Sequence, residues 1–213
     1  MRVSGTIYIA QYLANTLHDH GFSDVSPMKL QKVLFYAKAW GLVSGICLVD
    51  APFLKWTHGP INVEVWEHYH SKGYRGRHAV ISPQWLPVFA VPEEAGQLAE
   101  LIVDSYGPLG ALTLSAMTHR EAPWRDTPDN EMVPDERILA YYGAQPFARN
   151  FPLDFEGKPY YALPSDGDAA FTMDMSKQEA NQFRVYESFN TYRSYLERVR
   201  GELNDDWLNR LRA

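Results

Sequence analysis

The longest apolar stretch of the chain lies at residues 30–40, LQKVLFYAKAW, which contains only three polar positions. A helix that is apolar on all faces is typical of a domain interior, where neighbours contact it on every side. Ser26 is a suitable N-cap, and Pro27 suits the first helical turn, where its missing N–H has no partner in any case. Gly41 is suited to ending the helix. The pattern therefore predicts a buried central helix over about 26–41.

Amphipathic patterns on both sides of this stretch predict further helices. In the last of them, which Pro134 and Asp135 open, we expect Ile138, Leu139 and Tyr142 to point inward. The predicted helices lie near residues 6–20, 63–73, 93–106, 113–119 and 134–143. Residues 46–56 and 151–163 are apolar but interrupted, which is typical of short extended pieces. The fold class predicted is mainly α.

The last third of the chain has a different pattern. Four prolines stand between residues 144 and 175, and Ser176 with Glu179 forms a capping-box pair. Apolar residues at 4-3-4-3-4 spacing then predict the longest helix, at about 177–200 or beyond. We expect two parts, a compact domain at residues 5–143 and a C-terminal extension at residues 144–213.

Composition supports a folded protein and argues against one class of partner. The chain has 213 residues, of which 46% are hydrophobic and 14% aromatic, enough to bury a sizeable core. Its formal net charge is −6. A dedicated nucleic-acid-binding protein needs clustered Lys and Arg, so nucleic acid is not the expected partner.

Cys47 is the one cysteine, so the chain has no internal disulfide and nothing in it points to an oxidising compartment. It lies in an apolar run, which favours a small core residue. Near the N-terminus, Gln11, Asn15 and Asp19 interrupt the apolar rhythm, which is typical of neither a signal peptide nor a membrane span. We expect a cytoplasmic protein with no membrane partner.

Two groups of residues are candidate sites of chemistry. His68 and His70 diverge by about 200° on a helix and so do not share an ion, which predicts no metal site. His119 and Glu121 have the chemistry of an acid–base pair, but no catalytic motif accompanies them. A buried hydrogen bond from His119 that fixes the following turn is the favoured interpretation. The prediction is a protein that is not an enzyme and holds no cofactor.

Two charged or amphipathic segments are candidate binding surfaces. The basic cluster Lys72, Arg75, Arg77 and His78 is interpreted as a solvated loop, because the chain around it is acidic. The C-terminal stripe either packs on its own core or presents a seam to a partner. Aromatic and arginine side chains are typical anchors of protein interfaces. The candidate partner-binding residues in this helix are Tyr186, Phe189, Tyr192, Arg193, Tyr195 and Trp207.

Three strings carry a family resemblance: MKLQKVLFYAKAW, LKWTHGPINVEVWEHY and YGPLGALTLSAMTHREAPW. In order and spacing they resemble the Panacea family, the SocA-like antitoxin domains of bacterial and phage toxin–antitoxin pairs. The resemblance covers about residues 5–143 and departs at His58, where the family commonly has an aromatic residue. The matching residues are Lys29, Leu30, Gln31, Lys32, Tyr36, Trp56, Gly59, Pro60, Thr118, His119, Pro123 and Trp124.

The resemblance implies a mainly helical protein that neutralises a toxin encoded beside it, usually by direct binding. It also implies that the central helix is the scaffold, with residues 56–60 and 118–124 packed near it, and that most motif residues hold the fold. The surface that faces the toxin is then expected beside this helix and along the C-terminal one.

Other functions stay open at this stage. One is an adaptor that passes a bound partner to a protease, and another is a regulator that binds the DNA of its own operon. A hydrolase that uses His119 is a further alternative. The identity of the toxin, the stoichiometry and any homo-oligomer are left open by the sequence.

Overall fold

The computed structural model describes residues 5–75, 79–84, 91–152, 161 and 163. Contacts divide the chain into two compact units, residues 1–153 and 154–213, and every helix and strand described here belongs to the first. The predicted C-terminal helix, its capping-box pair and most of the predicted extended piece at 151–163 lie outside the described residues.

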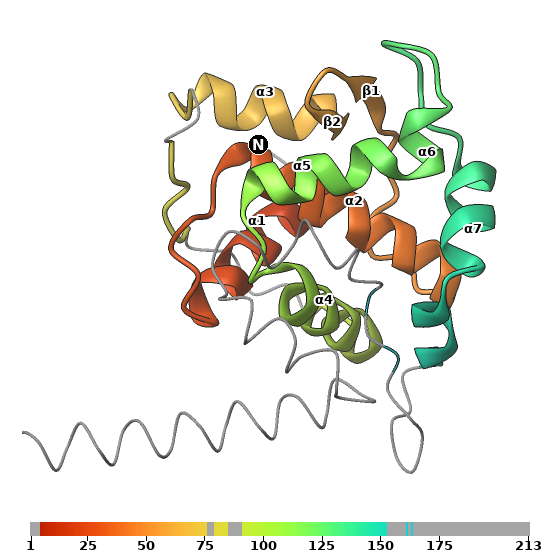
Figure 1. The fold of residues 1–213 in the computed structure, drawn as a ribbon. Coiled ribbons are helices and arrows are strands. Elements are labelled where there is room, and N and C mark those ends of the chain that lie inside the picture. The colour runs from red at the N-terminus through yellow and green to blue at the C-terminus, as the bar shows by residue number, and fades with distance from the viewer. Residues whose placement is uncertain (1–4, 76–78, 85–90, 153–160, 162, 164–213) are drawn as a thin grey trace, which may run out of the picture. The chain divides into compact units, whose positions relative to one another are not determined.

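The first unit is mainly helical, as predicted, and α2 runs through its middle (Figure 1). The elements in chain order are α1 Gly5–Asp19, α2 Pro27–Ser44, β1 Leu54–Trp56, β2 Gly59–Ile61, α3 Val63–Ser71, α4 Glu93–Tyr106, α5 Ala111–Arg120, α6 Ala122–Arg125, α7 Asp135–Gly143 and a 3-10 helix Pro146–Asn150. Among the helices described, none is long and apolar enough to cross a membrane.

Helix α2 begins where its cap predicts and ends later than expected. The Ser26 side chain accepts a hydrogen bond from the Lys29 amide, which is the N-cap contact. The helix passes through Gly41 and is capped by Gly45, whose φ of 76° is left-handed. A Cβ on Gly41 would lie 2.7 Å from the carbonyl oxygen of Ile46. Gly41 therefore serves a close backbone approach, and the prediction that it ends the helix was wrong.

Aromatic side chains from α2 fill the centre of the unit. Tyr36 stacks on Tyr106 of α4 with ring centroids 3.9 Å apart, and Trp40 Nε1 donates a 2.7 Å hydrogen bond to the Tyr106 hydroxyl. Trp40 also packs against Phe147, which follows α7 and is fully buried. Aromatic pairs of this kind contribute stability beyond the area they bury. Helix α2 is buried, as its pattern predicts, and it is the scaffold of the first unit, as the family resemblance implies.

The two strands form an antiparallel hairpin with Trp56 paired to Gly59, so that Thr57 and His58 make the turn. The hairpin is extended by a loop, because Leu54 forms a bridge with Met132. The predicted extended piece at 46–56 is therefore confirmed only over its last three residues. The hairpin leads directly into α3, whose first turn is capped by the Asn62 side chain.

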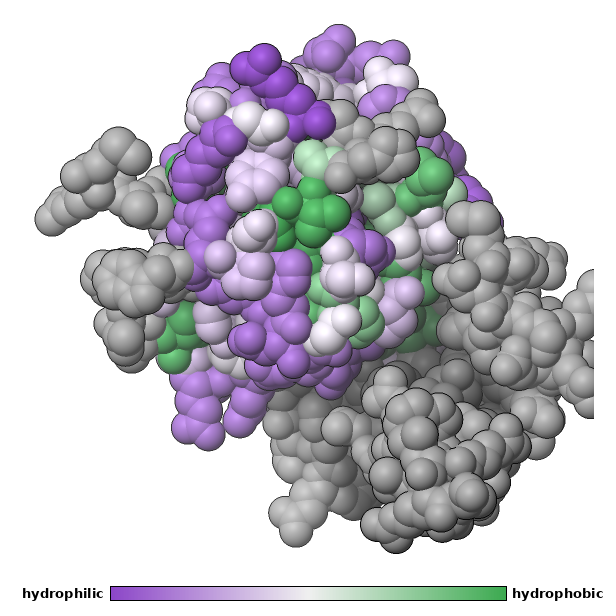
Figure 2. All heavy atoms as spheres, turned by 90° about the vertical axis from the view of Figure 1, so that its left-hand side faces the viewer, coloured by the Kyte–Doolittle hydropathy of each residue, from purple (hydrophilic) through white to green (hydrophobic). Residues whose placement is uncertain are grey.

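Two predictions of burial were wrong. Leu139 is 45% exposed, because Ile138 and Tyr142, four residues apart, supply the buried face of α7 and leave Leu139 to the side. Cys47 is exposed, since it lies just after the turn that caps α2, and the next residue, Leu48, is buried instead. Elsewhere on the surface, the face in Figure 2 shows small hydrophobic patches between hydrophilic residues.

Leu34 of α2 is fully buried, so Leu34→Ala should leave a cavity in the core. Large-to-small substitutions of this kind cost about 2–5 kcal/mol of unfolding free energy. Leu139→Ala on α7 is the matched control and should cost less than about 1 kcal/mol, because a half-exposed leucine loses little packing. Urea denaturation followed by circular dichroism measures both. Equal losses would contradict the central position of α2.

A cationic and aromatic groove as candidate functional site

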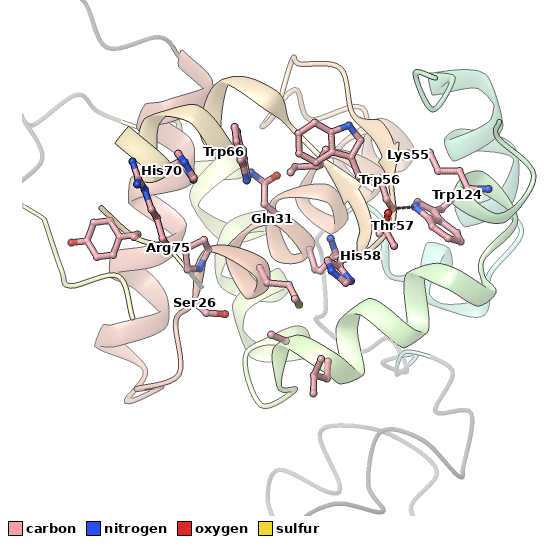
Figure 3. Close-up of a pocket in the computed structure, with 18 of the residues that line it drawn as sticks. Ser26, Gln31, Lys55, Trp56, Thr57, His58, Trp66, His70, Arg75 and Trp124 are labelled. Atoms are coloured by element: carbon pink, nitrogen blue, oxygen red, sulfur yellow. Dashed lines mark hydrogen bonds between the residues drawn. The ribbon is translucent and has the colours of Figure 1, made fainter. Parts of the chain in front are cut away.

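A groove of about 1240 Å³ opens on the surface where α2, the hairpin, α3 and α5 meet. Figure 3 shows His70 and Arg75 toward one end, His58 near the middle, and Lys55 with Trp124 at the other end. The side chains come from segments up to about a hundred positions apart in the sequence, from Ser26 to Asn130. Several family-motif residues line it: Gln31, Lys32, Trp56, Gly59 and Trp124.

Gln31 fastens α2 to the start of α3. Its side-chain Nε2 donates to the Asn62 carbonyl over 3.1 Å, and its Oε1 accepts from the Asn62 amide over 2.8 Å. Asn62 in turn caps α3 by accepting from the Val65 amide. Because both backbone groups of one residue are bound by a single side chain, Gln31 fixes the position of the hairpin exit.

Lys32 lies one residue further and reaches the hairpin itself. Its side chain is 2% exposed, and Nζ donates a 2.9 Å hydrogen bond to the Pro60 carbonyl. Burial removes water from the ammonium and lowers the pKa of Lys32 from 10.5 to about 7. The groove therefore contains a buried amine that is poised between its charged and neutral forms near neutral pH.

Gly59 allows this close packing. Its φ of 99° is in the region that favours glycine. A Cβ there would lie 2.6 Å from Lys32 Cε and 2.7 Å from Thr118 Oγ1. The hairpin thus approaches α2 and α5 at a point where a side chain has no room, which explains why a glycine stands in this motif.

His119 of α5 and Trp124 of α6 contact the hairpin through the backbones of Thr57 and Trp56. Their rings stack with centroids 4.0 Å apart, and Trp124 Nε1 donates to the Trp56 carbonyl over 3.3 Å. His119 hydrogen-bonds the Thr57 backbone, while its buried Nε2 has no hydrogen-bond partner. Burial, followed by the nearby charge of Lys32, lowers the pKa of His119. The hydrogen bond of His119 therefore holds the hairpin, and the interpretation that it fixes the following turn was wrong. His119 contacts that turn by stacking on Trp124.

Glu121, considered above as a partner of His119, is bound elsewhere. Its carboxylate accepts hydrogen bonds from the Tyr36 hydroxyl, at 3.1 and 3.2 Å, and from the Tyr142 hydroxyl at 2.7 Å. Burial, together with this carboxylate, raises the pKa of both tyrosines well above 10.0. No sequence pattern points to this cluster, because Tyr36 of α2, Tyr142 of α7 and Glu121 between α5 and α6 are brought together only by tertiary packing.

Lys29, at the start of α2, connects this helix to the end of α4. It is buried, and its Nζ donates to the Asp24 carboxylate and, over 2.7 Å, to the Gly107 carbonyl at the end of α4. Burial lowers the pKa of Lys29, and the hydrogen bond to Asp24 opposes that shift. Its position supports the expectation that motif residues hold the fold.

The remaining candidates divide between the groove and regions outside it. His70 stacks on Trp66, with ring centroids 4.6 Å apart, and lines the groove, whereas His68 Nε2 lies 3.1 Å from Gln11 Nε2 of α1. The two histidines therefore diverge, as helix geometry predicts. In the basic cluster, Arg75 lines the groove. Outside the described residues lie Arg77, His78 and all six candidate toxin-binding residues, Tyr186, Phe189, Tyr192, Arg193, Tyr195 and Trp207.

Fold and site together define a small helical domain with a surface groove lined by polar, cationic and aromatic side chains. Residues 30–125 match the family model described as Antitoxin SocA-like, Panacea domain. This segment is therefore similar to Panacea domains, which confirms the resemblance of the three motifs and supports a role in toxin–antitoxin systems in general. No curated protein and no solved structure matches the chain.

Gly59→Ala should destabilise the first unit strongly. A residue other than glycine at this φ costs about 1–3 kcal/mol, and the contacts with Lys32 and Thr118 add overpacking of a similar size. Gly45→Ala is the matched control, because Gly45 has a comparable φ and nothing within 4 Å of an added Cβ. Thermal unfolding of the two variants should differ. Equal effects would show that the close approach at Gly59 contributes nothing.

Removal of the Lys32 amine should change how stability depends on pH. Because the pKa of Lys32 is lower in the folded chain than in the unfolded chain, the folded protein binds fewer protons between pH 7 and 10.5, and its stability rises with pH there. From pH 7 to pH 9 this contribution is about 2 kcal/mol. Lys32→Met should lose that part of the rise.

Chemical denaturation at a series of pH values measures the effect. Lys55→Met removes a lysine from the same groove but leaves Lys32 in place, so it should keep the pH dependence of the original protein. A Lys32→Met variant with an unchanged pH profile would contradict the assignment.

Proposed function

We propose that this protein is the antitoxin of a type II toxin–antitoxin system and neutralises a co-encoded toxin by direct protein–protein binding in the cytoplasm. The family match over residues 30–125 carries the proposal. It supports a role in a toxin–antitoxin pair, and the groove adds a surface on which a protein can be held. The C-terminal candidates Tyr186 to Trp207 are proposed as additional toxin contacts.

The chemistry of the groove suits binding better than catalysis. Its aromatic residues include Trp56, Trp66 and Trp124, and tryptophan is among the residues that most often dominate binding energy at interfaces. The residues first considered for acid–base chemistry are held in structural contacts, His119 by stacking on Trp124 and Glu121 by two tyrosine hydroxyls. In this proposal the protein is not an enzyme.

Co-expression with the neighbouring gene tests the proposal. We expect the product of that gene to stop growth when it is induced alone, growth to resume when this chain is produced with it, and the two proteins to co-purify. A neighbouring product that is harmless alone, or a chain that neither rescues growth nor co-purifies, would refute the proposal.

The amount of the partner distinguishes direct neutralisation from delivery to a protease. A toxin that is held in a complex should accumulate at an undiminished level while growth resumes. A level that falls when this chain is produced, and recovers in a host that lacks the responsible protease, would show an adaptor instead. Quantitative immunoblotting of a tagged toxin gives the measurement.

A further inference from the structure

The groove has an excess of positive charge, although the whole chain is acidic. Lys32, Lys55 and Arg75 line it together with two histidines, and among the lining residues that the structure describes Asp129 is the one acid. Lys55 Nζ lies 3.4 Å from the Asp129 carboxylate, so that acid already faces a lysine. Within the described part of the lining, Lys32 and the exposed Arg75 have no acidic counterpart. An acidic ligand is the electrostatic complement of this surface.

Among the described cationic residues of the groove, Lys32 is the one that is buried. A lysine ammonium has three N–H donors. Lys32 Nζ uses one of them in its hydrogen bond to the Pro60 carbonyl. A buried charge is costly unless an opposite charge or further acceptors compensate it. Since Lys32 lines the groove, a carboxylate that enters the groove can supply that compensation.

The aromatic rings argue for a peptide ligand over a nucleic acid. Single-stranded nucleic acids bind by stacking bases on free aromatic faces. Here Trp66 already stacks on His70, and Trp124 stacks on His119 with Lys55 Nζ 4.4 Å from its ring centroid. These contacts cover part of the ring surface within the protein and leave less of it for stacking bases, so the rings are better suited to contacts with peptide side chains.

One apolar side chain completes the surface. Leu112, at the start of α5, is 60% exposed and lines the groove. An exposed leucine in a groove that also contains cationic groups suits a partner segment with both acidic and apolar side chains.

We propose that the groove binds an acidic segment of the toxin, with one carboxylate paired to Lys32 Nζ and an apolar side chain packed on Leu112. The proposal rests on the proposed function, because it names the part of the toxin that the antitoxin holds. It places the primary toxin contact in the Panacea domain, beside α2.

The protonation of Lys32 should make the affinity for the toxin depend on pH. A carboxylate beside Lys32 favours the charged amine, so binding should take up a proton when the pKa of Lys32 is near 7. Other groups that act on this corner are His58 in the hairpin turn, His119 of α5, and Lys55 with Asp129 at the groove end. Affinity should therefore fall as pH rises from about 6.5 to 8.5, and the part due to Lys32 should vanish in Lys32→Met.

Substitutions in the full chain test the location. Arg75→Glu and Leu112→Glu change exposed groove residues, so they should preserve the fold and weaken binding of the purified toxin at least tenfold each. Arg120→Glu and Leu139→Glu are the matched controls on exposed residues outside the groove lining, and should change binding less than twofold. Isothermal titration calorimetry measures affinity, and circular dichroism verifies folding.

Peptides test the chemistry. Fluorescein-labelled 15-residue peptides that tile the neighbouring gene product are titrated with the full chain by fluorescence anisotropy. The tightest binder should be acidic, and replacing its critical Glu or Asp by the amide should weaken it about tenfold. Lys32→Met should weaken the acidic peptide about tenfold but the amide peptide less than twofold, which is the coupling that a direct pair produces.

The outcomes separate this proposal from the one on which it rests. Failure of the full-length neighbouring product to bind refutes the proposed function. If that product binds while Arg75→Glu and Leu112→Glu bind as the controls do, the antitoxin function survives and the groove proposal is overturned. Tighter binding of a labelled 20-nucleotide single strand than of any peptide, with loss of that binding in Arg75→Glu, also overturns it.

Discussion

The arrangement of the first unit depends on hydrogen bonds from side chains of α2 to the backbone of the hairpin and of the residue that precedes α3. Gln31 binds both backbone groups of Asn62, and Lys32 binds the Pro60 carbonyl next to it. These backbone groups leave water when the hairpin packs on α2, and an unpaired buried polar group would cost about 1–3 kcal/mol each. Two consecutive side chains of α2 therefore decide where the hairpin ends and α3 begins.

The other polar residues of α2 act in the same way toward other elements. Lys29 binds the end of α4 through the Gly107 carbonyl, and Lys38 binds the carboxylate of Asp135 at the start of α7. The apolar residues between them supply the core. A helix that is apolar on all faces thus still has directional contacts, and its few polar positions determine how the surrounding elements are placed.

The sequence predicted the helices well, because their signals are local. Asn62 caps α3 and Ser26 caps α2 as expected, and the predicted helix at 93–106 has the observed bounds of α4. Gly41 misled the prediction because a glycine that ends a helix and one that admits a neighbouring carbonyl look the same in a sequence. Cys47 did so because an apolar run does not tell which of its members the chain turns outward.

Local sequence patterns did not predict the groove. The motif residues were predicted to hold the fold, and Lys29, Gln31 and Gly59 do make tight structural contacts. However, Lys32, Lys55 and Arg75 are at least twenty positions apart in the sequence, and only the packing of several elements places them on one surface. The tyrosine cluster around Glu121 was missed for the same reason, since each residue there belongs to a different segment.

The contact between Trp56 and Trp66 has a spectroscopic consequence. Their ring centroids are 5.5 Å apart with planes at 69°, close enough for the excited states of the two indoles to couple. Trp40 lies apart from them in the core, hydrogen-bonded to Tyr106. The near-ultraviolet circular dichroism of this tryptophan pair should therefore depend on how the hairpin packs on α3. Binding of a ligand in the groove can be followed through it in the unlabelled protein.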